Sequence, residues 1–274
     1  MTPSEEIIAS VKHPTIVSVR QSLGQVGGGR ATAFLVEDAK MVAQALAAGA
    51  PLQTALYLDP VEQPEEKALL ESVRRAGIEC RCVTRGVFFR VLGLGYETST
   101  RVLATVRAEP LAPSRLGELI DRNACFLIGE QIQDPRNVGV LIRTADALGV
   151  RAAIFSADSA DPYCRASVRS TTGSILRVPL VLADCLPEAL AVLRTHGVRP
   201  IGASAHATNV CWDADLSAPC AVVLGNETNG LSEGAKALCD LLLSIPMHGE
   251  ASSLNVTVAA GALLYEVARQ RACH

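Results

Sequence analysis

The sequence lacks an excess of charge of either sign. Its 25 Lys and Arg residues nearly balance 28 Asp and Glu residues, so the formal net charge at pH 7 is −3. This balance excludes binding to nucleic acid through bulk positive charge, and such a partner requires a local basic groove. A long hydrophobic run is also missing, because the uncharged stretch 256–265 is shorter than the roughly 20 apolar residues of a membrane span. We therefore expect no membrane partner.

The nine cysteines include no C-x-x-C pair. An odd number of scattered cysteines, from Cys80 to Cys273, fits small buried side chains in a reducing compartment better than a disulfide framework. The same scatter does not predict a zinc site, and we expect no bound metal. Residues 1–14 contain Glu5 and Glu6 but no continuous apolar stretch, so they do not resemble a secretory signal. A cytoplasmic location is expected.

A glycine fingerprint for dinucleotide binding is absent as well. Residues 27–29 are three consecutive glycines, and Gly93 and Gly95 are followed by Thr98 where a third glycine would stand. Neither segment matches G-x-G-x-x-G, so a Rossmann cofactor site is disfavoured. Residues 93–98 are typical of a turn between a helix and a strand, and residues 4–30 of an irregular N-terminal segment.

The 274 residues, 49% of them hydrophobic, are enough for two compact domains. From residue 33 onward short apolar segments alternate with amphipathic ones, a pattern typical of βαβ units. Asp38 is a suitable N-cap for the first helix of this pattern, and Gly49 is a suitable residue just after its end. The first domain is expected to have strands at 33–37, 52–59, 78–83 and 101–108, and helices at 38–49 and 64–77.

The segment 109–123 is the best candidate for a linker. It contains Pro110 and Pro113, and proline breaks both helices and strand ladders. We place the boundary near residue 112, which predicts domains at 1–112 and 113–274. The second domain repeats the alternation and again predicts an α/β fold. Its expected strands are 123–130, 152–156, 199–204, 220–227 and 241–246, and its expected helices are 137–149, 161–171, 186–197, 232–240 and 254–271.

Three strand-to-helix corners of the second domain carry polar clusters, and ligands of open parallel sheets gather at such corners. The first cluster is Asp-Pro-Arg-Asn at residues 134–137. Asn137 is a candidate N-cap for the helix that follows. Arg143 lies among the apolar residues of that helix, where an arginine either reaches the surface or meets an anion.

The second cluster, residues 222–233, leads from a buried type of strand into a glycine turn. Gly225 and Gly230 permit a close backbone approach to a ligand, and Ser232 is a candidate N-cap for the next helix. Glu227 has two interpretations that the sequence leaves open. It is either a solvated loop acid or a group that holds a hydroxyl or orients another side chain.

The third cluster, residues 245–266, ends a strand and passes through a polar loop into the final helix. Ser252 or Ser253 is the expected N-cap, with Asn255 in the first turn. Exposed amide groups at such a helix start bind anionic groups. The small residues 259–262 suit a close helix contact, either within the chain or between subunits.

Taken together, the three clusters resemble the signature motifs of the SpoU (TrmH) family of RNA 2′-O-ribose methyltransferases. The matching segments are NVGVLIRTADALG, LGNETNGLS and IPMHGEASSLNVTVAAGALLYE. The resemblance is strong over residues 123–270 and looser over residues 30–110. There FLVEDAKMVAQALAAG is similar to the L30e-like substrate-binding domain that often precedes the catalytic domain in this family.

The resemblance implies an α/β fold class with a C-terminal parallel-sheet domain that contains a deep trefoil knot. It also implies a homodimer. Because knotted chains are rare, the knot is expected from the resemblance alone. The implied cofactor is S-adenosyl-L-methionine, held by residues that match family positions: Gly225, Ile245, Ser253 and Leu254.

The implied catalytic residues are Asn137, Arg143, Glu227, Ser253 and Asn255. Methyl transfer from a sulfonium to a ribose hydroxyl needs the oxygen positioned and partly deprotonated, with the neighbouring phosphate restrained. It needs no nucleophilic side chain, unlike methylation of cytosine C5. Since a guanidinium group does not normally lose its proton in proteins, we expect Arg143 to anchor the phosphate and to stabilise the developing negative charge.

The RNA target is less sharply defined by the resemblance. Thr228 stands where many relatives have glycine, and residues 98–106 depart from the proline-glutamine-glycine segment that relatives often show. The chain ends soon after the third motif, without the C-terminal extension typical of tRNA-methylating relatives, which favours 23S ribosomal RNA. The alternatives are a tRNA 2′-O-methyltransferase, a catalytically silent RNA-binding member, and an enzyme that methylates a base.

Overall fold

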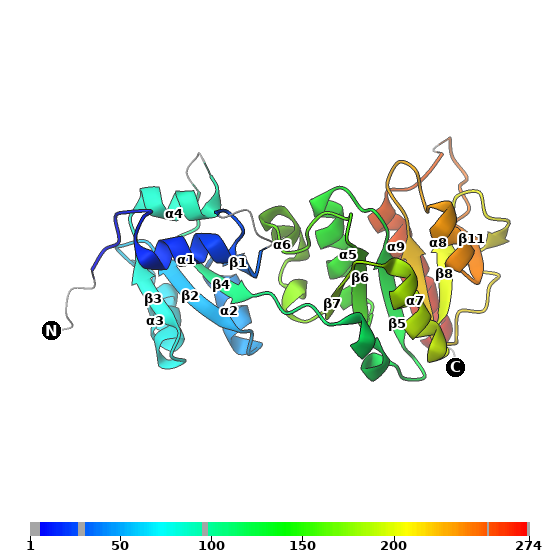
Figure 1. Cartoon of the computed structure of the whole chain (residues 1–274), viewed down its shortest axis with the longest axis horizontal. Helices are drawn as coiled ribbons and strands as arrows, with labels where there is room; N and C mark the ends of the chain where they lie inside the picture. Colours follow the sequence, from blue (N-terminus) through cyan, green and yellow to red (C-terminus); the bar gives the residue numbers. More distant parts are fainter. Residues whose placement is uncertain (1–5, 27–30, 95–97, 251, 273–274) are drawn as a thin grey trace. The chain divides into compact units, whose positions relative to one another are not determined.

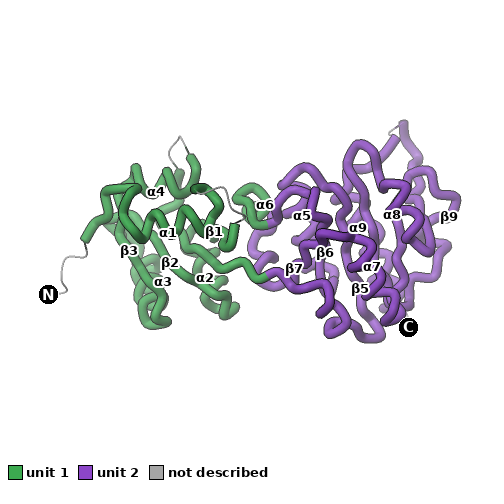
Figure 2. Tube along the Cα trace, in the orientation of Figure 1, with its two compact units in different colours: residues 1–109, 163–169 green, residues 110–162, 170–274 purple. Residues whose placement is uncertain are grey.

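The computed structural model describes residues 6–26, 31–94, 98–250 and 252–272. The chain divides into two compact units, which Figure 2 distinguishes by colour. Unit 1 consists of residues 1–109 and 163–169, and unit 2 of residues 110–162 and 170–274. The short segment 163–169 lies beyond the boundary expected near residue 112, yet it belongs to unit 1. The glycine run 27–29 and Gly95 lie outside the described residues.

Unit 1 is built on a four-stranded sheet in the order β1-β4-β2-β3 (Figure 1). Its elements are α1 (Pro14–Ser22), β1 (Ala33–Glu37), α2 (Ala39–Ala47), β2 (Leu52–Tyr57), α3 (Pro64–Arg75), β3 (Glu79–Cys82), α4 (Arg85–Leu92) and β4 (Val102–Arg107). Strand β4 pairs antiparallel with both β1 and β2, whereas β2 and β3 pair parallel. The expected βαβ pattern therefore holds for β2–α3–β3, and β1 and β2 do not pair with each other.

The sequence predicts an irregular segment over residues 4–30, but residues 14–22 form helix α1. The prediction was wrong because the stability of this helix comes from tertiary packing and not from local propensity. The β-branched residues Ile16 and Val19 are poor helix formers, yet both are buried against α4 and the sheet. Pro14 at the first helical position and the His13 side chain, which accepts a hydrogen bond from Thr15 N, define its start.

Helix α2 begins and ends as its sequence predicts. The Asp38 carboxylate accepts a hydrogen bond from Met41 N at 2.9 Å, which confirms it as the N-cap. Gly49 follows the helix with φ of +66°, a conformation that favours glycine.

The segment 163–169 is held in unit 1 by one stacked ring pair and one ionic cluster. Tyr163 stacks on Phe34 with 5.5 Å between the ring centroids. The Glu37 carboxylate, which is 7% exposed, accepts hydrogen bonds from Arg165 Nε at 2.5 Å and Arg165 Nη2 at 2.8 Å. Arg169 Nη1 donates to the same carboxylate at 3.0 Å. A buried carboxylate is thus matched by two guanidinium groups from one short helix.

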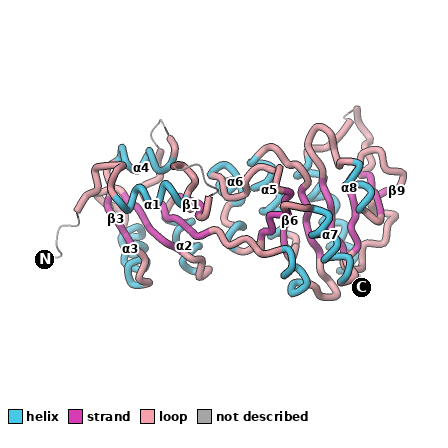
Figure 3. Tube along the Cα trace, viewed as in Figure 1, coloured by secondary structure: helices cyan, strands magenta, loops and turns pink. Residues whose placement is uncertain are grey.

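Unit 2 is built on a seven-stranded sheet in the order β7-β6-β5-β10-β8-β11-β9, in which every pair of neighbours is parallel. Figure 3 shows these strands between helices. The strands are β5 (Cys125–Gly129), β6 (Ala152–Ser156), β7 (Leu180–Ala183), β8 (Arg199–Ala203), β9 (Asn209–Val210), β10 (Cys220–Leu224) and β11 (Leu241–Ser244). The parallel α/β sheet predicted for this part of the chain is confirmed.

The helices of unit 2 form two groups. Helices α5 and α9 pack on each other, and α7 packs on η1 and α8. Their bounds are η1 (Pro113–Leu119), α5 (Pro135–Ala147), η2 (Ser174–Leu176), α7 (Leu186–Thr195), α8 (Glu233–Leu238) and α9 (Val256–Ala272). Helix α6 (Arg165–Thr171) begins in the segment assigned to unit 1. Of the helices in the described part of the chain, none is long and apolar enough to cross a membrane.

The expected linker 109–123 is largely part of the unit 2 core. After Pro113 the chain forms the 3-10 helix η1, and the side chain of Leu116 is fully buried against α7 and the sheet. Leu111 N donates to Leu180 O on the edge strand β7 at 2.7 Å. The two prolines predicted a break in regular structure correctly, but the apolar residues between and after them anchor the segment.

We expect Glu37→Gln to lower the free energy of unfolding by about 2 kcal/mol, because it leaves the Arg165 and Arg169 guanidinium groups without a counter-charge. Urea unfolding measures the change. Glu109→Gln is the matched control, since the Arg107–Glu109 pair is more than half exposed and its loss is expected to cost no more than about 0.5 kcal/mol. Equal effects of the two substitutions would contradict the role of Glu37.

Candidate active site

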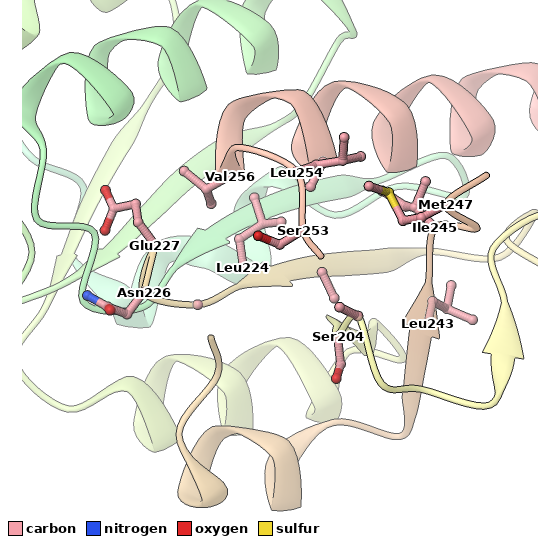
Figure 4. A pocket seen from close by; sticks show the side chains of 14 residues that line it. Ser204, Leu224, Asn226, Glu227, Leu243, Ile245, Met247, Ser253, Leu254 and Val256 are labelled. Atoms are coloured by element: carbon pink, nitrogen blue, oxygen red, sulfur yellow. The ribbon is translucent and has the colours of Figure 1, made fainter. Parts of the chain in front are cut away.

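The loops after β8, β10 and β11 meet around a cavity at the carboxyl edge of the sheet, where ligands of parallel α/β folds bind. The cavity is open to solvent, and the empty space among its lining residues, part of it open solvent, is about 680 Å³. Figure 4 shows apolar side chains, among them Leu243, Ile245 and Met247, at one end, and Asn226 and Glu227 at the other. Its lining residues are Ala203, Ser204, Ala205, Leu224, Gly225, Asn226, Glu227, Leu243, Ile245, Met247, Ser253, Leu254, Val256 and Ala259.

The loop after β10 folds back on itself so closely that Gly225 has no room for a side chain. A Cβ atom on Gly225 would lie 2.2 Å from Gly230 C and 2.2 Å from Leu231 N, both of which are backbone atoms. Asn226 N donates to Gly230 O at 3.0 Å, and Gly230 N donates to Asn226 O at 2.8 Å. Gly230 itself has φ of +69°, which glycine adopts without strain. Gly225 thus serves a close approach of the chain's own backbone and Gly230 a positive φ, and the approach to a ligand expected of both stays a prediction.

The Glu227 carboxylate connects this loop to the segment that begins α5. It accepts hydrogen bonds from Gln133 N at 3.1 Å, from Asp134 N at 3.2 Å and from Asn137 Nδ2 at 2.9 Å. Partial burial acts to raise the pKa of Glu227, but the bonds from Asn137 and from backbone amide groups outweigh it and leave the pKa below its ordinary value. Glu227 is therefore an ionised acceptor at neutral pH. Of its two interpretations, the orienting group is the one that this geometry supports.

Asn137 joins all three clusters. Its Nδ2 donates to Glu227, and its Oδ1 accepts a hydrogen bond from Asn255 Nδ2 at 3.4 Å. The expectation that Asn137 caps α5 was wrong, because the helix begins at Pro135 and the Asp134 carboxylate is the N-cap, accepting from Arg136 N at 2.8 Å. Asn137 thus lies in the first turn, where its amide group is available for contacts outside the helix.

The start of α9 also differs from its prediction. Asn255 caps this helix, because its Oδ1 accepts hydrogen bonds from Thr257 N at 2.8 Å and Thr257 Oγ1 at 2.7 Å. Ser252 and Ser253, the expected caps, lie before the helix, which begins at Val256. Ser253 lines the cavity together with Ile245 and Leu254. The structure thus brings together every predicted cofactor residue. It also brings together four of the predicted catalytic residues, which are Asn137, Glu227, Ser253 and Asn255.

Arg143 is the predicted site residue that the single chain does not bring to the cavity. It lies on the exposed face of α5, outside the cavity lining. Among the described residues, none accepts a hydrogen bond from its guanidinium group. The roles assigned to Arg143 and to the other site residues stay predictions.

Two site residues were missed by sequence reasoning. Glu130, 8% exposed at the end of β5, accepts hydrogen bonds from Ser232 N at 2.9 Å and Ser232 Oγ at 2.5 Å, and so fixes the start of α8. The Ser232 hydroxyl also caps α8 through Ala235 N, as predicted. Ser204 lines the cavity after β8. Both follow apolar strands directly, which is the signal that identifies them.

Comparison with known proteins places this geometry in a family. The model of the SpoU rRNA Methylase family matches residues 124–265. A 23S rRNA (uridine(2479)-2′-O)-methyltransferase of Streptomyces viridochromogenes is 35% identical over 255 residues, which cover 88% of this chain and 84% of the relative. The chain belongs to the SpoU rRNA methylase family. The predicted family is thus confirmed.

Other known proteins are similar to this chain over different lengths. A 23S rRNA (guanosine-2′-O-)-methyltransferase of Yersinia pestis is 37% identical over 146 residues, covering 53% of this chain and 59% of the relative. The crystal structure of the SpoU methyltransferase AviRb of Streptomyces viridochromogenes with AdoMet has a TM-score of 0.81 and 31% identity, covering 96% of this chain and all of that one. A structure of an AdoMet-bound rRNA methyltransferase from Sinorhizobium meliloti, 23% identical with a TM-score of 0.82, shares the fold and covers 96% and 97%.

The cavity fits S-adenosyl-L-methionine, the cofactor of this family. The apolar end at Leu243, Ile245 and Met247 suits an adenine ring, and the hydroxyl groups of Ser204 and Ser253 suit the polar parts of the molecule. The residues that would hold the cofactor are those of the loops that follow β8, β10 and β11.

We expect Gly225→Ala to weaken S-adenosyl-L-methionine binding by about tenfold or more, because the added methyl group forces the backbone of residues 230–231 away. Isothermal titration calorimetry measures the affinity. Gly234→Ala is the matched control, since its Cβ would meet Ser232 Oγ at an ordinary 3.7 Å and lies in helix α8. Unchanged affinity in Gly225→Ala would show that the loop tolerates the methyl group.

The lowered pKa of Glu227 has a consequence for stability as a function of pH. The ionised carboxylate contributes stability that is fully present above the ordinary glutamate value of about 4.3 and is lost as pH falls through the lower pKa of the folded protein. We therefore expect the difference in unfolding free energy between wild type and Glu227→Gln to be constant near neutral pH and to shrink below about pH 4. Urea unfolding at a series of pH values measures it. A difference in unfolding free energy that stays constant in acid would refute the stabilising role of the ionised Glu227 carboxylate.

Proposed function

We propose that this protein transfers a methyl group from S-adenosyl-L-methionine to a ribose 2′-hydroxyl of RNA, and that the RNA is 23S ribosomal RNA. The observation that carries the proposal is the contact of three motifs beside one cavity. Asn255 of the third motif donates to Asn137 of the first, which donates to Glu227 of the second. Relatives in the SpoU family that cover most of the chain, such as the Streptomyces enzyme, support the choice of ribosomal RNA.

The residues of this chain bind and orient the reactants. The cofactor supplies the methyl group when bound. Glu227 is a poor candidate for the general base, because its lone pairs already accept three hydrogen bonds from Gln133, Asp134 and Asn137, and because its pKa is low. Its part is to hold the loop after β10 against the start of α5. We propose that the proton of the ribose hydroxyl leaves to phosphate or water.

Arg143 anchors the phosphate next to the target ribose and stabilises negative charge on the oxygen. This role requires a second chain, because Arg143 lies outside the cavity of its own chain. We propose a homodimer in which Arg143 of one subunit completes the site of the other. The proposal includes no metal ion, so a chelator is expected to leave methyl transfer unchanged.

The exposed faces of α5 and α9 support a homodimer. Val140 on α5 is 36% exposed, and on α9 Val258 is 54% and Tyr265 64% exposed. Val258, Ala262 and Tyr265 follow one another at helical spacing on the exposed face of α9. Large apolar side chains on two helices that pack on each other indicate a protein contact surface. A twofold dimer through this surface uses the same residues in both subunits.

Two further parts of this proposal, the trefoil knot and the L30e-like nature of the N-terminal domain, come from the family resemblance. The domains at 1–112 and 113–274, with their border placed from Pro110 and Pro113, likewise stay predictions. A cytoplasmic location follows from the proposed substrate, since ribosomal RNA is modified where ribosomes are assembled.

Methyl transfer from labelled S-adenosyl-L-methionine to 23S ribosomal RNA of cells that lack the gene tests the proposed function. We expect label in 23S ribosomal RNA, at a 2′-oxygen. If the target nucleotide is replaced by its 2′-deoxy form, methylation of the ribose is abolished, whereas methylation of a base would continue. Label confined to transfer RNA, or RNA that is bound and stays unlabelled, would favour the tRNA or the catalytically silent alternative.

We expect Arg143→Ala to lower the rate of methyl transfer by about 10²–10³-fold, as removal of a charge-stabilising donor does in other enzymes, while cofactor affinity stays unchanged. Labelled transfer and calorimetry measure the two quantities. Near-normal turnover in this variant would overturn the role of Arg143.

Mixing two variants with impaired sites, at a cofactor concentration that the wild type binds and Gly225→Ala does not, tests whether the site is shared between subunits. Arg143→Ala keeps its cofactor loop, and Gly225→Ala keeps its Arg143. A mixed dimer therefore contains one complete site, and an equal mixture is expected to regain about a quarter of wild-type activity. No gain on mixing, with subunit exchange confirmed by mass spectrometry, would place Arg143 in the site of its own chain.

A further inference from the structure

The two faces of the sheet in unit 1 carry helical layers of different charge. The α1–α4 layer, residues 6–26 and 84–94, covers one face through a core that includes Ile16, Phe88 and Leu56. The α2–α3 layer, residues 38–50 and 59–77, contains the two helices that pack on each other and on strands β1, β3 and β4. Figure 1 shows α1 and α4 side by side and α2 and α3 apart from them.

The α1–α4 layer is basic and the α2–α3 layer is acidic. The α1–α4 layer has one acidic residue, Glu6, and four basic residues, which are Lys12, Arg20, Arg85 and Arg90. The α2–α3 layer has four basic residues, Lys40, Lys67, Arg74 and Arg75, and six acidic ones, which are Asp38, Asp59, Glu62, Glu65, Glu66 and Glu71. A chain with net charge −3 thus has a local basic surface, as a nucleic-acid partner requires.

Helices α1 and α4 run in the same direction. The basic residues near their N-terminal ends therefore lie at one end of the layer, and those near their C-terminal ends lie at the other. Thr84 N donates to Ile8 O at 3.0 Å at one end, and Gln25 Nε2 donates to Val91 O at 2.7 Å at the other. Lys12 and Arg85 therefore belong to the first end. Arg20 and Arg90 belong to the second.

Several of these cations have donors that the protein itself does not use. Among the described residues, none pairs with the exposed side chains of Lys12 and Arg90. Arg20 Nε also has no hydrogen-bond partner in the part of the chain that the structure describes, but it is buried and out of reach of an external phosphate. By contrast, Arg74 on the other layer donates to Tyr57 Oη, and Arg75 donates to Glu71 O and Ser72 Oγ.

An aromatic ring lies between the two arginines of α4. Phe89 is half-buried, and it directly precedes Arg90 and follows Arg85 by one helical turn on the exposed side of the helix. Its ring packs edge-on against Phe88, with 6.4 Å between the centroids. Basic side chains that flank a partly exposed ring are the arrangement with which proteins hold single-stranded nucleic acid, through phosphate contacts and base stacking.

We infer that the α1–α4 layer binds the RNA substrate, with Lys12 and Arg90 on phosphates and Phe89 stacked on an unpaired base. The inference rests on the proposed function, because it assigns a surface to the RNA of that reaction. It places substrate recognition on one helical layer of unit 1, apart from the residues that hold the cofactor.

The double variant Lys12→Ala/Arg90→Ala tests the phosphate contacts. Filter binding to 23S ribosomal RNA transcribed in vitro, without cofactor and over a salt series, measures affinity. We expect affinity to fall by about tenfold or more, and the logarithmic salt slope to fall by about 0.7 for each phosphate that the variant no longer neutralises. In methyl transfer, the KM for RNA rises while the KM for cofactor and kcat stay unchanged.

Lys67→Ala/Arg75→Ala is the matched control. It removes one exposed lysine and one exposed arginine from the α2–α3 layer, and we expect no change in RNA affinity. Equal decreases in affinity in both double variants would overturn the inference, and so would unchanged affinity in Lys12→Ala/Arg90→Ala.

Phe89→Leu tests the stacking contact separately, since leucine keeps the apolar packing of α4. We expect RNA affinity to fall by about fivefold or more with an unchanged salt slope, because stacking is not electrostatic. Wild-type affinity in this variant would exclude stacking. Because binding is measured without cofactor, RNA that binds through this layer and receives no methyl group contradicts the proposed function and leaves the inference standing.

Discussion

The site depends on one ionised carboxylate that is surrounded by donors. Glu227 accepts hydrogen bonds from two backbone amides before α5 and from Asn137, and Asn137 holds Asn255 at the start of α9. Three segments that are far apart in the sequence are therefore fixed by one negative charge. The Glu227 carboxylate is suited to accepting hydrogen bonds and not to taking up a proton, because protonation would weaken the hydrogen bonds that it accepts.

The shape of the cavity wall depends equally on a missing side chain. Gly225 lets two backbone segments approach within a distance that excludes even a methyl group. The loop closed in this way presents Asn226 and Glu227 on one side of the cavity, and the apolar ends of β11 and α9 form the other. Close packing of backbone on backbone makes such a wall rigid, which suits a site that must hold a donor and an acceptor in line.

Much of the fold was predictable because its signals are local. Most strand and helix segments of unit 2 follow from hydrophobic period, although β7 and β9 were not predicted. The caps Asp38 and Ser232 follow from residue type and position. Helix α1 was not predictable in this way, because the burial of Ile16 and Val19 depends on α4, which lies more than sixty residues away in the sequence. The convergence of the three corners was predictable from the parallel sheet together with the family motifs.

The errors within the site have a common physical origin. Asn137 was predicted as a cap and Asn255 as a first-turn residue, and the structure exchanges these positions. The side chain of an asparagine near the start of a helix can either cap the helix by bonding to the local backbone or bond to a residue distant in the sequence. Which use prevails depends on whether Asp134 or Ser253 takes the cap, and a pattern within one segment does not contain that information. Arg143 shows the further limit, since the residues that the structure describes give it no hydrogen-bond partner within its own chain.

The assignment of residues 163–169 to unit 1 means that the polypeptide passes between the units three times, after residues 109, 162 and 169. A fragment cut after residue 109 therefore loses the arginines that neutralise Glu37, and the complementary fragment carries Tyr163 without Phe34. Each fragment therefore lacks contacts that the other one supplies. Recombination between relatives at the apparent domain border would exchange one side of this ionic cluster without the other.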